Sequence, residues 1–156
     1  MAEETRSPVL TGGCQCGKVR YALYAEPGSA DICHCRMCQR AVGNLFMAVA
    51  GVPLDRFAWT RGEPAVFRSS SVAERGFCRD CGTPLTFRYR AKNAISVTTG
   101  SLDEPARGRP TRQYGIESRV PWWRELFDLP GTTTADDPPP GGLEALVSHQ
   151  HRDGDP

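Results

Sequence analysis

Cysteine is the residue type in this sequence whose spacing could support chemistry. The seven cysteines fall into three short groups, and the spacing within each group is typical of metal ligands. An odd number of tightly clustered thiols disfavours a disulfide framework and favours metal binding. The groups are Cys14 and Cys16, then Cys33, Cys35 and Cys38, and finally Cys78 and Cys81.

These groups can be divided between two zinc ions. The segment Cys78–Gly82 has the form of a zinc knuckle, in which two thiols reach one ion and a glycine permits the close turn around it. A knuckle supplies two of four ligands, so it needs a second pair. The sequence therefore predicts a four-cysteine site of Cys14, Cys16, Cys78 and Cys81 and a three-cysteine site of Cys33, Cys35 and Cys38. The first is saturated, as structural zinc is, whereas the second has the open fourth position of catalytic zinc.

Other interpretations of the cysteines remain open. His34 could be a fourth ligand, although its place between two ligands would strain the chain. Seven ordinary buried cysteines are less favoured, because chance rarely places cysteines at ligand spacing. An iron–sulfur cluster is also less favoured, because the spacings differ from those of ferredoxins. His149 and His151 lie near the end of the chain, where we expect them to be inert.

The three-cysteine site favours chemistry at sulfur. Zinc with three thiolates is a weaker Lewis acid for water than zinc with three imidazoles. It suits a fourth sulfur ligand, because the ion lowers the pKa of a bound thiol. Arg36 and Arg40 flank the ligand turn and could offset the added negative charge, or they could be solvated helix charges. The chemistry predicted is the formation or cleavage of a carbon–sulfur bond on a small thiol.

Short strands must position these thiols. Candidate strands lie at residues 17–25, 45–50, 65–69, 72–77, 85–89 and 95–99, separated by Gly, Pro, Asn and Asp. Residues 33–41 predict a tight metal-binding turn that runs into a short helix, and residues 121–126 predict another short helix. Many short strands and little helix predict a mainly β fold.

The length of 156 residues fits one domain with flexible ends. We predict a flexible leader at 1–10, the zinc-binding domain at 11–131, and a disordered, acidic, Pro- and Gly-rich tail at 132–156 with at most a helical turn at 143–147.

Charge and hydropathy limit the partners. Residues 1–131 carry a net charge of +5, which suits a small anionic ligand but is too weak and scattered for nucleic acid. No apolar run reaches the roughly 18–20 residues of a membrane span, and residues 1–6 are unlike a secretory signal. We therefore expect a cytoplasmic protein that binds neither nucleic acid nor membrane.

Five segments together resemble the glutathione-dependent formaldehyde-activating enzyme family, to which centromere protein V is related. They span about residues 11–130 and read GGCQCGKVRY, CHCRMCQRAVG with Phe46 after it, GFCRDCGTPL, TTGSLDEP and ESRVPWW. The resemblance implies a β-tent fold of short antiparallel strands organised around zinc-binding cysteines. It also implies a carbon–sulfur lyase that joins formaldehyde to glutathione as S-hydroxymethylglutathione.

The resemblance extends to individual residues. In the family, the cysteines matching Cys14, Cys16, Cys78 and Cys81 hold structural zinc, and those matching Cys33, Cys35 and Cys38 hold catalytic zinc, which agrees with the division made from spacing. Members often carry a histidine where this chain has Gln113-Tyr114-Gly115.

The leading functional hypothesis is a zinc-dependent carbon–sulfur lyase that acts on a glutathione adduct or a similar thiol. One alternative is a carrier that binds glutathione or another thiol without turnover. Another is a structural zinc module with an interaction role, which the absence of a basic chromatin-binding arm disfavours. No oligomeric state is predicted.

Overall fold

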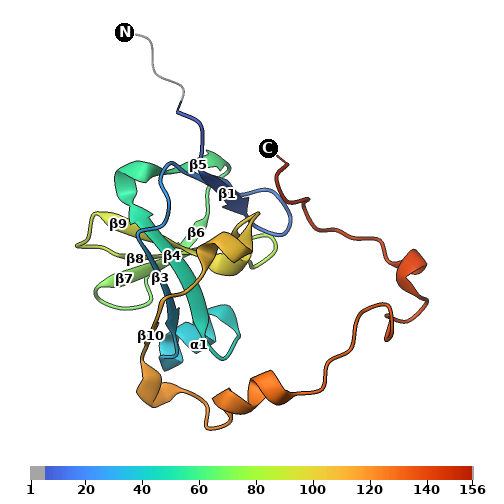
Figure 1. The fold of residues 1–156 in the computed structure, drawn as a ribbon. Coiled ribbons are helices and arrows are strands. Elements are labelled where there is room, and N and C mark those ends of the chain that lie inside the picture. The colour runs from blue at the N-terminus through green and yellow to red at the C-terminus, as the bar shows by residue number, and fades with distance from the viewer. Residues whose placement is uncertain (1–5, 156) are drawn as a thin grey trace.

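The computed structural model describes residues 6–155, which form two β-sheets and a few short helices (Figure 1). Residues 1–5 of the predicted leader lie outside the described residues. The strands within the described part are β1 (Leu10–Gly13), β2 (Arg20–Leu23), β3 (Ser29–Cys33), β4 (Met47–Pro53), β5 (Phe57–Arg61), β6 (Ala65–Phe67), β7 (Ala73–Phe77), β8 (Pro84–Tyr89), β9 (Ala94–Thr98) and β10 (Arg112–Tyr114).

The smaller sheet has the order β1-β2-β5 and is antiparallel. All four residues of its central strand β2 are buried, including Arg20, whose charge is paired. Gly12 on β1 lies against the ring of Tyr21, so closely that a Cβ atom there would collide with the tyrosine hydroxyl. The glycine therefore allows the close packing of β1 on β2.

The larger sheet has the order β10-β3-β4-β9-β8-β7-β6. All its pairs are antiparallel except β10 with β3. Its apolar residues Val97 and Leu85 pack with Tyr21 and Leu23 of the smaller sheet, and all four side chains are fully buried. The main core thus lies between the two sheets, where burial of apolar surface is the driving force.

The described residues contain one α-helix, α1 (Arg36–Val42), which begins within the second cysteine group and includes Cys38. It ends at Gly43, which has a left-handed backbone and donates its N–H to the Gln39 carbonyl, as glycines at helix ends commonly do. The other helices are single 3₁₀ segments: η1 (Leu54–Arg56), η2 (Thr99–Ser101), η3 (Pro105–Gly108), η4 (Ile116–Ser118), η5 (Trp123–Asp128) and η6 (Leu143–Ala145). None of the helices in the described part has the length and apolar character that a membrane crossing requires.

The mainly β fold class is confirmed, and each candidate strand from the sequence overlaps an observed one. Four strands were not anticipated, namely β1, β3, β5 and β10. β3 and β10 contain few apolar residues, and their pairing depends on partners far away in the sequence. The helix expected at 121–126 is the 3₁₀ segment Trp123–Asp128.

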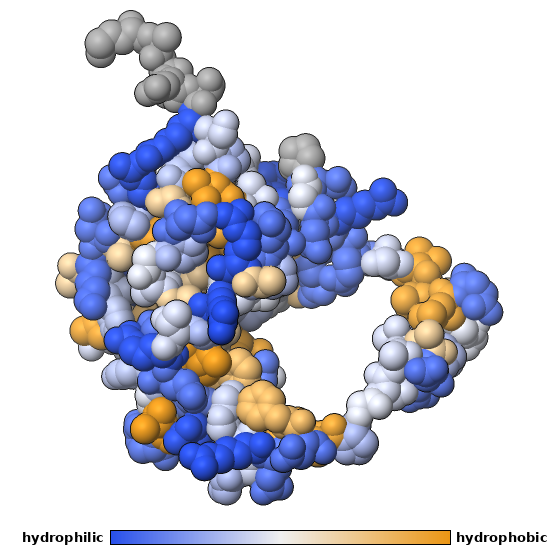
Figure 2. Space-filling view, viewed as in Figure 1, coloured by the Kyte–Doolittle hydropathy of each residue, from blue (hydrophilic) through white to orange (hydrophobic). Residues whose placement is uncertain are grey.

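The end of the chain leaves the body and then returns to it. Residues 131–150 are exposed except for Pro139 and Gly142, and Figure 2 shows an open space between this segment and the body of the molecule. The backbone N–H of His151 then donates to the Gln15 carbonyl. At the other end, Leu10 is buried in β1, one residue inside the predicted leader.

Candidate metal centre

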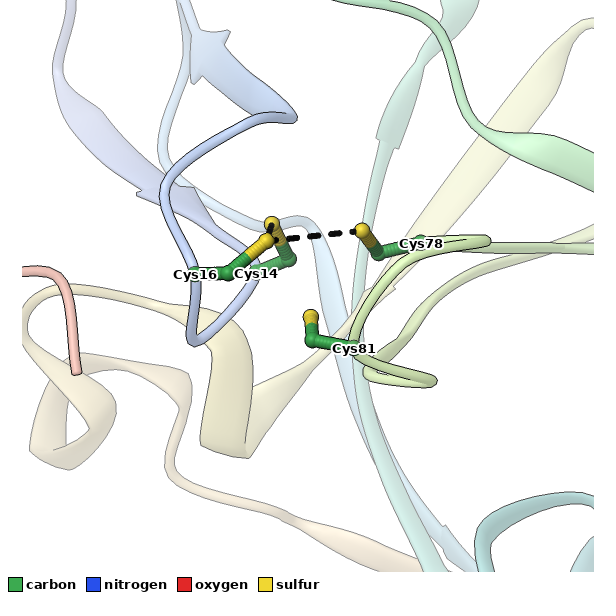
Figure 3. A group of neighbouring side chains, drawn as sticks. All are labelled: Cys14, Cys16, Cys78 and Cys81. Carbon is green, nitrogen blue, oxygen red and sulfur yellow. Dashed lines mark hydrogen bonds between the residues drawn. The ribbon is translucent and has the colours of Figure 1, made fainter. Parts of the chain in front are cut away.

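The first two and the last two cysteines of the chain form one cluster. Their Sγ atoms all lie within 4.8 Å of one another, and they converge from two separate loops (Figure 3). The Cys16 sulfur is 3.5 Å from that of Cys14 and 3.7 Å from that of Cys78. Sulfurs bound to one tetrahedral ion at about 2.3 Å lie about 3.8 Å apart, whereas a disulfide needs about 2.05 Å. This cluster therefore fits a tetrahedral metal ion.

The two loops that carry these thiols have similar backbones. In the first, the Gly17 N–H donates to the Cys14 carbonyl, and in the second, the Gly82 N–H donates to the Cys78 carbonyl. Both glycines have a positive φ, 76° and 75° respectively, which other residues rarely adopt. The loop with the Cys-x-Cys spacing and the loop with the Cys-x-x-Cys spacing thus each form a tight turn, and both turns direct their thiols to the centre of the cluster. Because one loop joins β1 to β2 and the other joins β7 to β8, the cluster ties the two sheets together.

The thiols of this cluster differ in how readily they ionise. Burial opposes ionisation of Cys81, but hydrogen bonds from Thr83 and nearby backbone groups outweigh it and lower the pKa of Cys81 to about 6. The Lys18 backbone favours the Cys16 thiolate, yet burial and the neighbouring thiols raise the pKa of Cys16 to about 12. Because close thiolates repel one another, some thiols of the cluster stay protonated when no cation is present. A metal ion that binds there must therefore displace their protons.

The middle three cysteines form the second cluster, with Sγ atoms that also lie within 4.8 Å of one another. Cys33 ends β3, Cys35 immediately precedes α1, and Cys38 lies in the first turn of that helix. Burial raises the pKa of Cys33 to about 12. Burial acts in the same sense on Cys35, but backbone N–H groups of Cys38 and Met37 lower the pKa of Cys35 below its usual value. Cys35 is therefore the thiol of this cluster that ionises most readily.

A distant segment braces this ligand turn. The Tyr114 carbonyl of β10 accepts the His34 N–H at 2.9 Å, next to the parallel pairing of β10 with β3. Gly115 has a φ of 66°, and a Cβ atom there would lie 2.9 Å from the Cys35 nitrogen. Sequence reasoning did not assign Gln113-Tyr114-Gly115 to this role, because nothing local indicates that the segment lies against residues about 80 positions earlier.

His34 points away from the three thiols. Its side chain is fully buried, and its Nε2 atom is 2.9 Å from the Gln113 side-chain oxygen. Its ring lies edge-on to Trp123, with centroids 4.6 Å apart, and 6.0 Å from the ring of Phe46. The structure does not bring His34 into the three-cysteine group, because successive side chains of the extended turn face opposite sides.

The three thiols line a cavity of about 590 Å³, a volume in the range of small-molecule sites. Its basic side chains are Arg75, Arg88, Lys92 and Arg112, against the carboxylates of Asp31 and Glu117. Arg112 is 2.9 Å from Asp31, and Arg88 is 3.8 Å from Glu74. The surplus of basic groups makes the cavity suitable for an anionic ligand.

The cation nearest the thiols is Arg75, on β7. Its Nη2 atom donates to the Cys38 sulfur at 3.3 Å, and its guanidinium carbon lies 4.9 Å from the centre of the Phe87 ring. Arg36 and Arg40, the two candidates from the sequence for offsetting the thiolate charge, are exposed and do not line the cavity, as solvated helix charges would be. Residues two positions from Cys38 lie about 200° around the helix, so their side chains face away from the sulfur.

The sequence is similar to those of known proteins. Residues 9–118 match the family model described as glutathione-dependent formaldehyde-activating enzyme. The chain is 33% identical over 90 residues to an uncharacterised lyase of Schizosaccharomyces pombe, covering 53% of this chain and 59% of that protein. It is 32% identical over 74 residues to a Phaeosphaeria nodorum protein provisionally named a glutathione-dependent formaldehyde-activating enzyme, covering 46% of this chain and 39% of that protein. The matched part thus spans about half the length of these relatives.

A solved structure supports the fold alone. The crystal structure of a Rhodobacter sphaeroides protein is similar to this chain with a TM-score of 0.54 and 23% identity. The similarity covers 66% of this chain and 98% of that protein.

Proposed function

Because the chain belongs to the glutathione-dependent formaldehyde-activating enzyme family, we propose that it is a zinc-dependent carbon–sulfur lyase. The proposed substrate is a small thiol adduct such as S-hydroxymethylglutathione. One observation carries the proposal: Cys33, Cys35 and Cys38 converge on the cavity, and within residues 6–155 no further His, Cys, Asp or Glu joins their group. Three protein ligands beside an accessible cavity are typical of catalytic zinc.

The donor atoms support zinc in both clusters. Thiolates are soft ligands that select zinc over magnesium or calcium. In this proposal Cys14, Cys16, Cys78 and Cys81 hold a structural ion, because four ligands leave no position for substrate. Cys33, Cys35 and Cys38 hold the catalytic ion, and the chain binds two ions in all.

The reaction follows from a thiol held at the cavity wall. Zinc would supply the positive charge that holds the free thiol as a thiolate and that favours the sulfur as it leaves the adduct. In the cleavage direction the carbon–sulfur bond breaks and its electron pair goes to sulfur. The hydroxyl group of the adduct loses its proton, and the oxygen electrons form the carbonyl bond of formaldehyde. The reverse direction joins the thiolate to the carbonyl carbon.

The protein side chains would hold and shield the reacting atoms. Met47, Val49 and Phe87 give the cavity an apolar wall beside the thiols, which limits the access of water. Lys92 lines the same cavity with no carboxylate partner among the described residues, so it can attract a carboxylate of the substrate. Glutathione, with a thiol and two carboxylates, has the functional groups that this cavity suits.

Exchange spectroscopy by NMR tests the proposal. We expect the zinc-loaded chain to accelerate the exchange of formaldehyde between its free form and S-hydroxymethylglutathione. Cys38→Ser should abolish the acceleration, whereas Arg40→Gln, an exposed change on the same helix, should preserve it. If glutathione binds but exchange is no faster than in buffer, the chain is a thiol carrier and the lyase proposal is wrong.

A further inference from the structure

The positively charged side chain of Arg75 contacts two sulfur atoms and no carboxylate of the described residues. Its Nη2 atom donates to the Cys38 sulfur at 3.3 Å, and its Nη1 atom donates to the Met47 sulfur at 3.2 Å. No carboxylate within residues 6–155 forms an ion pair with it. Burying part of an arginine without an acidic partner costs free energy, unless another anion balances its charge.

The neighbouring arginines of the cavity differ in this respect. Arg88 pairs with Glu74 at 3.8 Å, and Arg112 pairs with Asp31 at 2.9 Å. Their charges are therefore already offset by the protein. Arg75 alone among these three directs its charge at the cysteine cluster.

Arg75 is also held in place. It lies in the middle of β7, opposite Phe87 of β8, and its guanidinium packs over the ring of that phenylalanine at 4.9 Å. Its Nε atom is buried and has no hydrogen-bond partner. A guanidinium has five N–H donors in a rigid plane. The two sulfur contacts use two of them, which leaves donors for another anion at the same place.

We propose that Arg75 is a positioning residue that makes the three-cysteine site prefer an anionic thiolate over a neutral fourth ligand. This inference rests on the proposed function, in which Cys33, Cys35 and Cys38 hold a metal ion with one open position. A divalent ion with three thiolates carries one negative charge, and a fourth thiolate adds a second. The fixed guanidinium stabilises the doubly charged complex more than the singly charged one, because charge-assisted hydrogen bonds strengthen with the charge of the acceptor.

The test uses the cobalt-loaded chain, whose visible absorption reports the ligands of the ion. Mercaptoethanol serves as a thiol without carboxylates, and imidazole serves as a neutral ligand. The variants are Arg75→Met, Arg75→Lys and, as a control, Arg40→Met, which removes an exposed arginine that does not line the cavity. Cobalt stoichiometry and circular dichroism establish that each variant is folded and loaded.

Arg75→Met should weaken mercaptoethanol binding by about 10–100-fold, the value of a hydrogen bond to a charged group, while imidazole binding stays within about twofold of the unaltered chain. Arg75→Lys should retain part of the preference, because it keeps the charge and loses the planar donors. Arg40→Met should change neither affinity. Should Arg75→Met weaken both ligands equally, or neither, Arg75 has no role in selecting the ligand and the inference is wrong.

The same titration distinguishes the two proposals. If the unaltered cobalt chain binds mercaptoethanol and Arg75→Met binds it equally well, the inference fails and the open position remains. If the spectrum of the unaltered chain does not respond to either ligand, the open position itself is contradicted, and the inference fails with it.

Discussion

At the scale of single residues, the Arg20–Asp103 ion pair links the smaller sheet to the segment after β9. Two N–H groups of Arg20 donate to the two oxygens of Asp103 at 2.9 and 2.6 Å, and both side chains are more than nine-tenths buried. Burial alone would raise the pKa of Asp103. Hydrogen bonds from Arg20 and Thr11 outweigh burial and lower that pKa below its usual value.

This ion pair predicts a loss of stability in acid. A carboxyl group with a depressed folded-state pKa contributes its full stability above its unfolded value of about 3.9 and loses it as the pH falls through the folded value. Asp103→Asn leaves Arg20 buried and unpaired, so we expect it to reduce the free energy of unfolding by about 3–5 kcal/mol at pH 7. It should also flatten the dependence of stability on pH below about pH 4. Urea unfolding at several pH values measures both, with the exposed Asp55→Asn as control.

We expect substitutions in the two cysteine clusters to have different effects on folding. Cys78 is fully buried in the main core, in the cluster that ties the two sheets together, and a structural zinc site contributes about 10 kcal/mol to folding. Cys78→Ser should therefore give unfolded or insoluble protein. Cys35→Ser should fold and keep one of two zinc equivalents, because Cys35 lies at the edge of a smaller cluster. Metal analysis with circular dichroism provides the measurement, and equal unfolding of both variants would contradict separate roles.

At the scale of elements, the short strand β10 and the turn after it support the ligand turn of Cys35. Gly115 combines a φ of 66° with a close approach to the Cys35 backbone, whereas Gly43 has a φ of 60° with no atom near its Cβ position. Alanine at either position incurs the same left-handed strain, about 1–2 kcal/mol. Only at Gly115 does it also displace a proposed ligand.

We therefore expect Gly115→Ala to lose metal from the three-cysteine cluster, and Gly43→Ala to lose stability alone. Zinc content after graded chelation distinguishes them. Both variants should keep the ion of the four-cysteine cluster, because that cluster lies on other loops. If Gly115→Ala retained both ions as firmly as Gly43→Ala, β10 would have no part in positioning the ligands.

The hairpin between β8 and β9 carries Lys92, which we expect to attract a carboxylate of glutathione. The chain has two lysines. Lys92 lines the cavity and lies over the Tyr89 ring at 5.3 Å, whereas Lys18 pairs with Asp80 at 3.3 Å beside the other cluster. Lys92→Glu should weaken glutathione binding about three- to tenfold at low salt and leave mercaptoethanol binding unchanged. Lys18→Glu is the control, and an equal effect of both would exclude a local carboxylate contact.

At the scale of the whole molecule, the two sheets share one core and the tail lies largely outside it. The returning end makes a backbone hydrogen bond from His151 to Gln15, and a Cβ atom on Gly17 would meet the His151 ring. The backbone of Gly154 also helps to lower the pKa of Asp103. Two such contacts contribute about 2 kcal/mol, which corresponds to about 4–8 °C in melting temperature for a chain of this size.

Truncation after Gly131 should therefore lower the melting temperature by no more than about 8 °C and leave the zinc content unchanged. Truncation after Ser148 should have the same effect, because it removes the same contacts and keeps the exposed stretch. Differential scanning calorimetry with metal analysis makes the comparison. A much larger fall, or a lost ion, would mean that the tail is an integral part of the fold.

The sequence by itself determined the features that depend on neighbouring residues. The grouping of Cys33, Cys35 and Cys38 follows from spacing within six residues, because a tight turn brings such thiols together whatever surrounds it. The partly alternating apolar residues of 17–25 likewise predicted a strand where β2 lies, and the many short candidate strands predicted the mainly β fold.

Only the tertiary structure decided which distant groups surround the thiols. Arg75 reaches Cys38 because the register of β7 on β8 places it opposite Phe87, and Gly115 reaches Cys35 because β10 pairs with β3. Strand register depends on which faces the whole core buries, and a shift of one residue would point Arg75 to the other side of the sheet. The proposed ligands of the site are therefore local in the sequence, whereas the positive charge that faces them depends on the register of the assembled sheet.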